Sequence, residues 1–188
     1  RESKRGGAWM TSYRNQQMEN GKRKNPVISI VCNFTKPTAT TPSLLTFDET
    51  TTFFHEFGHA LHGLLSNVNY RSLAGTNVPR DFVELPSQIM ENWAAEPEVL
   101  KMFAKHYKTG EVIPDELIEK MTKAGTFDQG FATTEYLAAS LLDMQYHTID
   151  KPITTDVNTF ELNGMKNIGL IEAIIPRYGS TYFSHIFS

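Results

Sequence analysis

Residues 55–59 read His-Glu-Phe-Gly-His, and they lie in a stretch whose composition is typical of a helix. Each residue of an α-helix turns by about 100° and rises by about 1.5 Å, so His59 lies about 40° around and about 6 Å along from His55. The two imidazoles therefore project from one face, close enough to share one ion, with Glu56 on the same arc. This arrangement is typical of a hydrolytic zinc site, in which the imidazoles hold the metal and the carboxylate takes a proton from water.

Composition narrows the classes of protein that such a chain can be. The 188 residues are 40% hydrophobic and 21% charged, which favours one folded domain over disorder. A net charge of −3 argues against nucleic acid or an anionic membrane as the main partner. Cys32 is the single cysteine, so no internal disulfide is possible. No apolar run approaches the ~18–20 residues that a membrane span needs.

The pattern of residues predicts a mainly α fold with a small β element. Residues 27–34 are rich in β-branched side chains and lie between two prolines, which predicts a strand, whereas residues 1–26 are polar and suggest loop and turn. Further helices are expected over residues 97–108, 114–123, 156–168 and 170–175, and a long one is expected over residues 128–149.

Two other helices are expected to carry the candidate site. Thr46 and Glu49 have the spacing of a capping box, which predicts a helix from there to about Ser66. A second helix is expected to begin at Asp81 and to contain Glu84. The loop between these helices would allow them to run side by side.

A catalytic zinc site takes three protein ligands and keeps a fourth position open, so a third ligand must be found. The metzincin pattern would place Gly at position 62 and His at position 65, but this chain has His62 and Leu65 there. A thermolysin-like arrangement takes a Glu from the next helix instead. Glu84 lies 25 positions after His59, near the start of the second predicted helix, and is therefore the candidate third ligand.

Two segments together resemble the thimet oligopeptidase family of zinc peptidases. Residues 54–63 read Phe-His-Glu-Phe-Gly-His-Ala-Leu-His-Gly, and residues 75–88 read Gly-Thr-Asn-Val-Pro-Arg-Asp-Phe-Val-Glu-Leu-Pro-Ser-Gln. The second segment looks most like the bacterial peptidyl-dipeptidase branch of the family. Residues 7–10 and 31–34 are also similar to family segments, so the resemblance covers nearly the whole chain.

The resemblance implies a set of roles for these residues. His55, His59 and Glu84 would bind one zinc ion, and Glu56 would be the general base for hydrolysis of oligopeptides, releasing C-terminal dipeptides. The last residues, His-Ile-Phe-Ser at 185–188, match the opening of a family segment that contacts substrate, which makes His185 a further catalytic candidate.

Family members are several times longer than this chain. The resemblance therefore implies that residues 1–188 are a single fragment, truncated at both ends, of a zincin-like helical core within a larger helical peptidase. Its expected partners are short peptides and the missing N- and C-terminal parts of the same protein, with neither nucleic acid nor membrane. A cytoplasmic location is expected, with the periplasm left open because the native N-terminus is absent. The alternative is a folded zinc-binding fragment that is inactive because substrate-binding segments are missing.

Other polar residues near the motif have less defined roles. His62 lies on the same helix face as the motif and is assigned to packing or to support of a ligand rather than to metal binding. Asp81, Gln88 and Glu91 could orient ligands, or could simply be solvated. The strand over residues 27–34 could hold an extended peptide through backbone pairing.

Overall fold

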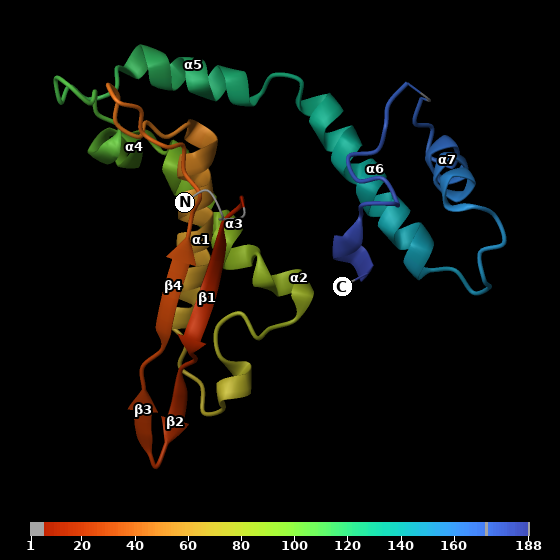
Figure 1. Cartoon of the computed structure of the whole chain (residues 1–188), viewed down its shortest axis with the longest axis horizontal. Coiled ribbons are helices and arrows are strands. Elements are labelled where there is room, and N and C mark those ends of the chain that lie inside the picture. Colours follow the sequence, from red (N-terminus) through yellow and green to blue (C-terminus); the bar gives the residue numbers. More distant parts are fainter. Residues whose placement is uncertain (1–5, 172, 188) are drawn as a thin grey trace. The chain divides into compact units, whose positions relative to one another are not determined.

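The computed structural model describes residues 6–171 and 173–187 (Figure 1). The chain divides into two compact units, one ending at Ile118 and the other beginning at Glu119. Helices make up most of the regular structure, with a small β element at the N-terminal end. The predicted fold class, mainly α with a small β element, is therefore confirmed.

Four short strands form two antiparallel pairs in the first unit. Strand β1 (Trp9–Arg14) pairs with β4 (Val27–Val31), and β2 (Gln17–Glu19) pairs with β3 (Lys22–Lys24). The β1–β4 register places Trp9 opposite Val31 and becomes irregular after Ser12. The β2–β3 pair lies between β1 and β4 in the sequence, so the two pairs form one ribbon that turns back at the β2–β3 hairpin.

The prediction of loop over residues 1–26 is wrong, because three of the strands lie there. The β2–β3 hairpin turns at Asn20 and Gly21, which have φ angles of 51° and 71°. Positive φ at both central residues is the signature of the tight hairpin turn that Asn-Gly favours. The flanking strands are short and charged, so they lack the apolar alternation by which strands are usually predicted.

Helix α1 (Phe47–Leu64) begins where the capping box predicts. The Thr46 hydroxyl accepts a hydrogen bond from the backbone N–H of Glu49, and the Glu49 carboxylate accepts one from the backbone N–H of Thr46. Glu49 also accepts hydrogen bonds from Thr35, which attaches the loop after β4 to the start of the helix. The cap therefore satisfies backbone donors that a helix start would otherwise leave without partners.

The second predicted helix is interrupted at Glu84. A short 3₁₀ turn, η1 (Arg71–Leu73), precedes helix α2 (Arg80–Val83). Helix α2 ends at Glu84, and α3 (Leu85–Ala95) begins directly after it. Pro86 lies in the first turn of α3 and has no N–H to donate to the preceding turn. Glu84 is consequently at the junction of two helices.

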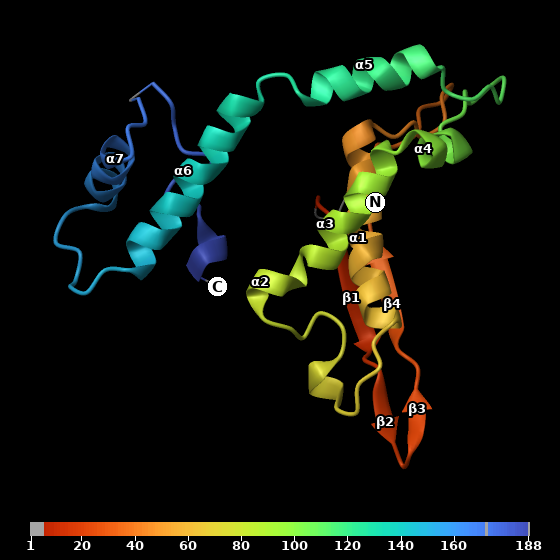
Figure 2. The same ribbon diagram turned by 180° about the vertical axis from the view of Figure 1, so that it is seen from behind.

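Helix α1 lies between α3 on one side and the β1–β4 ribbon on the other, as both views show (Figures 1 and 2). Gly63 faces the ribbon, since a Cβ there would meet the side chain of Ile28. The buried Gln16 amide further attaches the ribbon to the loop after α1. Gln16 donates to the carbonyl of Val68 over 3.0 Å and accepts from its N–H over 2.7 Å.

The remaining helices complete the chain. These are α4 (Pro97–Phe103), α5 (Asp115–Gly125), α6 (Gln129–His147), α7 (Val157–Asn167) and the 3₁₀ turn η2 (Ser184–Phe187). The second unit has its own small apolar core, formed by Ala138, Ala139, Leu142, Met165 and Phe183. The helix expected over residues 170–175 is absent from the residues described there. In the described ranges, no helix has the length and apolar character to cross a membrane.

The capping box generates a test of local stability. We expect Thr46→Ala to lower the free energy of unfolding by about 1 kcal/mol, because the helix start loses its side-chain acceptor. Thr52→Ala is the matched control: Thr52 is exposed inside α1, where Ala is the better helix former. Urea denaturation of both variants measures the difference, and equal stabilities would contradict a role for the cap.

Candidate metal centre

Three side chains from two neighbouring segments meet at one point. His55 and His59 come from α1, and Glu84 comes from the junction between α2 and α3. The same carboxylate oxygen, Glu84 Oε2, lies 3.2 Å from the Nε2 atom of His55 and 3.2 Å from that of His59. One ligand atom from each of the three residues lies within 4.8 Å of the others.

This donor set fits a divalent metal ion. Two imidazole nitrogens and one carboxylate are a known ligand set of catalytic zinc, which leaves a fourth position open. The Glu84 side chain is 49% exposed, whereas those of His55 and His59 are 25% and 12% exposed. The site is thus open to solvent on the Glu84 side and closed on the helix α1 side.

Glu56 is next to His55 in the sequence but is not one of the three convergent side chains. Its side chain is buried, and its Oε2 atom has no hydrogen-bond partner among the described residues. Burial raises the pKa of the Glu56 carboxyl; the nearby His55 and His59 oppose this shift, and Glu84 adds to it. A carboxylate with a raised pKa and a free oxygen is suited to accept a proton.

Helix α3 also supplies groups that contact two of the three candidate ligands. His55 Nδ1 lies 2.6 Å from Glu91 Oε1. The hydroxyl of the buried Ser87 donates to Glu84, with 2.8 Å both to the backbone carbonyl and to Oε2. By contrast, His59 Nδ1 is buried without a hydrogen-bond partner in the described part of the chain. Ser87 was not singled out from the sequence, although it lies three residues after Glu84.

Gly58, inside the motif, lies in close contact with the start of α3. A Cβ at this position would lie 2.5 Å from the carbonyl oxygen of Pro86 and 2.6 Å from the Cα atom of Ser87. Both neighbours are backbone atoms at the start of α3, which side-chain rotation cannot move. Only glycine at position 58 therefore permits this approach, which brings Glu84 to the two histidines.

The site lies in a cleft of about 420 Å³. It is lined by Ala8, Trp9, Met10, His55, Glu56, His59, Thr76, Val83 and Glu84. Of these residues, Trp9 and Met10 begin strand β1, and Ala8 directly precedes it. The predicted strand over residues 27–34 contributes no lining residue, so β1 is the strand of the β1–β4 pair that borders the site.

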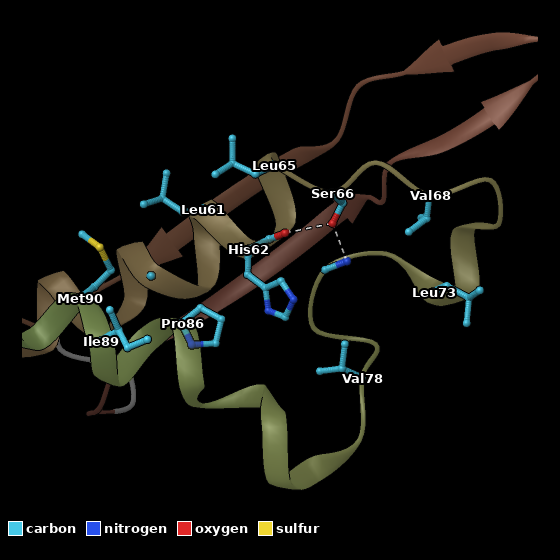
Figure 3. Close-up of a pocket in the computed structure, with 12 residues that line it drawn as sticks. Leu61, His62, Leu65, Ser66, Val68, Leu73, Val78, Pro86, Ile89 and Met90 are labelled. Carbon is cyan, nitrogen blue, oxygen red and sulfur yellow. Dashed lines mark hydrogen bonds between the residues drawn. The ribbon is translucent and has the colours of Figure 1, made fainter.

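His62 is not one of the three convergent side chains. Its ring projects into an adjacent apolar cavity of about 490 Å³ between α1, the start of α3 and the loop that carries Val78 (Figure 3). Burial lowers the pKa of His62, and the nearby His59 adds to this. His62 thus lines the apolar cavity and lies outside the group of three.

The other sequence candidates divide into two groups. Glu91 contacts His55, whereas neither Asp81 nor Gln88 has a side-chain hydrogen bond to the site in the ranges described. His185 belongs to η2 in the second unit, and its side chain lies outside the described part of the structure. Its role in substrate contact stays a prediction.

Comparison with known proteins assigns this sequence to a family. The sequence profile described as Peptidase family M3 matches residues 1–188, the whole chain. The chain belongs to peptidase family M3. The resemblance to thimet oligopeptidase-type peptidases that the motifs indicate is thereby confirmed.

Individual peptidases also align with most or all of this chain. The chain is 49% identical to the dipeptidyl carboxypeptidase of Escherichia coli and 40% identical to oligopeptidase A of the same organism, over its full length in both cases. It is also 34% identical to a mitochondrial intermediate peptidase of Sclerotinia sclerotiorum, over 86% of its length. The chain spans 28% of the length of the two Escherichia coli relatives.

The close approach at Gly58 generates a testable prediction. We expect Gly58→Ala to destabilise the protein by about 1–3 kcal/mol, because the added methyl group must push the α3 backbone away from α1. The same displacement moves Glu84 from the histidines, so affinity for a divalent metal should fall as well. Urea denaturation and chelator competition measure the two effects.

Gly125→Ala is the matched control, because a Cβ there meets no atom within 4 Å. We expect this control to keep wild-type metal affinity and to be at least as stable as the wild type. Unchanged metal affinity in Gly58→Ala would show that the close helix contact does not position Glu84.

Proposed function

We propose that this chain holds the catalytic centre of a zinc-dependent peptidase that hydrolyses peptide bonds in oligopeptides. His55, His59 and Glu84 would be the ligands of one zinc ion, and Glu56 would be the general base. The observation that carries the proposal is the position of Glu84 Oε2, 3.2 Å from Nε2 of both histidines, next to a buried carboxylate with a free oxygen. Membership of peptidase family M3 supports the reaction class.

The positions of these side chains support the following chemistry. A bound zinc ion supplies a Lewis acid that activates water and polarises the scissile carbonyl. Glu56 accepts the proton of the water as its oxygen bonds to the carbonyl carbon, and then passes that proton to the leaving amine nitrogen as the C–N bond breaks. The reaction needs no covalent intermediate with the enzyme.

The cleft supports an extended peptide as substrate. Ala8, Trp9 and Met10 line it together with His55 and Glu56, so the start of β1 runs past the reacting groups. Backbone groups on a strand edge can pair with an extended peptide and position its carbonyl. The names of the dipeptidyl carboxypeptidases among the relatives support release of C-terminal dipeptides.

We further propose that this chain is part of a larger protein. Because residues 1–188 match 28% of the length of the first relatives, we propose that further parts of the same protein complete the substrate-binding walls. A cytoplasmic location stays a prediction. The alternative function, a folded zinc-binding segment without turnover by itself, is favoured by the same coverage.

Replacement of Glu56 tests the proposed mechanism. We expect Glu56→Gln to lower peptide hydrolysis by at least about 100-fold while bound zinc stays near one ion per chain, because the amide cannot accept the proton. The measurements are release of a C-terminal dipeptide from a blocked oligopeptide and metal analysis of the purified protein. Glu98→Gln, which makes the same change at an exposed position in α4, should leave both values unchanged.

The possible outcomes separate the alternatives. Full activity in Glu56→Gln would refute the role of Glu56 as base. Zinc binding without any hydrolysis in the wild-type chain would favour the non-catalytic alternative, and absence of zinc binding would refute the metal centre itself.

A further inference from the structure

We infer that Glu91 is a positioning residue for the metal centre, which fixes His55 in the tautomer and orientation that metal binding requires. The inference rests on the proposed function, because it assigns a partner to one proposed ligand. It goes further by naming a residue that touches neither the metal position nor the substrate cleft, and whose effect passes through His55.

The two ring nitrogens of His55 have separate partners. Nδ1 lies 2.6 Å from Glu91 Oε1, while Nε2 lies 3.2 Å from Glu84 Oε2. An ionised carboxylate can only accept a hydrogen bond, so Nδ1 must carry the proton in this contact. The lone pair of the neutral ring then lies on Nε2, the atom that faces Glu84 and His59.

The contact has the features of a strong interaction. A distance of 2.6 Å is at the short end for a charge-assisted hydrogen bond. The side chains of His55 and Glu91 are 25% and 36% exposed, so water screens the contact less than it would on an open surface. The carboxylate also raises the electron density on the ring, which makes Nε2 a better donor to a cation.

The two histidines differ in whether Nδ1 has a carboxylate partner within the described ranges, so Glu91 supports His55 alone. His59 Nδ1 has no hydrogen-bond partner in the part of the chain that the structure describes. His55 is thus the member of the pair whose tautomer is held by a carboxylate. Glu91 lies seven residues after Glu84, two helical turns along, so α3 and the junction before it provide both a proposed ligand and a support for another.

A purely structural contact between α1 and α3 would have a different signature. In that case, removal of Glu91 would lower stability without changing the tautomer of His55 or the intrinsic affinity for metal. The test therefore uses two measurements that a structural role would leave unchanged, one of them on metal-free protein.

The first measurement is affinity for Zn²⁺ by chelator competition. We expect Glu91→Ala to weaken binding by about 10- to 100-fold, the range found when such supporting partners of metal ligands are removed. Glu91→Gln keeps a carbonyl oxygen that can accept from Nδ1–H, so its loss should be smaller. Glu98→Gln, an exposed position on α4, should bind zinc like the wild type.

The second measurement is the tautomer of His55 in metal-free protein. Nitrogen-15 NMR of labelled histidines, at about pH 8 where ordinary imidazoles are neutral, distinguishes a protonated Nδ1 from a protonated Nε2. The signal of His55 is identified by its loss in His55→Gln. We expect a protonated Nδ1 in the wild type and in Glu91→Gln, and a mixture of tautomers in Glu91→Ala.

Each outcome decides the inference. Weaker zinc binding with a changed tautomer in Glu91→Ala supports it. Wild-type affinity or an unchanged tautomer in Glu91→Ala overturns it, while the proposed function stands because the wild type still binds zinc. If the wild type itself binds no zinc, the proposed function and this inference fail together. Should Glu91→Ala not fold, Glu91→Gln decides by itself: weaker binding at unchanged stability supports the inference, and wild-type binding overturns it.

Discussion

The contact between helices α1 and α3 at Gly58 is the constraint on which the rest of the site depends. Spacing within α1 alone brings His55 and His59 to one face, but two histidines do not make a catalytic metal site. The third group, Glu84, lies just before the first turn of α3, and that turn touches Gly58 through the backbone of Pro86 and Ser87. The absence of a side chain at position 58 thus determines how far the carboxylate is from the imidazoles.

Some polar groups around this contact have hydrogen-bond partners among the described residues, and others have none. Helix α3 satisfies His55 through Glu91 and Glu84 through Ser87, whereas Glu56 Oε2 and His59 Nδ1 are buried without partners in the described structure. Buried polar atoms without hydrogen bonds cost free energy, and their occurrence beside a group of convergent donors is typical of a functional site. Hydrogen bonds from α3 therefore hold two of the three candidate ligands, while the Glu56 carboxylate oxygen stays available.

The sequence predicts those parts of the structure that depend on residues close together in the chain. The start of α1 and the common face of its histidines depend on residues three or four positions apart, which a pattern contains directly. The β1–β4 pairing could not be predicted, since it depends on a partner strand elsewhere in the chain. The β2–β3 hairpin is local, and the Asn-Gly dipeptide at its turn is the one signal of it, because its charged strands lack apolar alternation. The role of Glu91 stayed open for a related reason: which polar side chain of α3 faces His55 depends on the rotation of that helix against α1.

The most direct test of this account is a crystal structure of the zinc-loaded protein, with diffraction recorded on both sides of the zinc absorption edge. The account predicts one anomalous peak, bounded by Nε2 of His55, Nε2 of His59 and the carboxylate of Glu84, with α3 in contact with Gly58. A peak elsewhere, or a Glu84 side chain directed away from both histidines while zinc is bound, would contradict it.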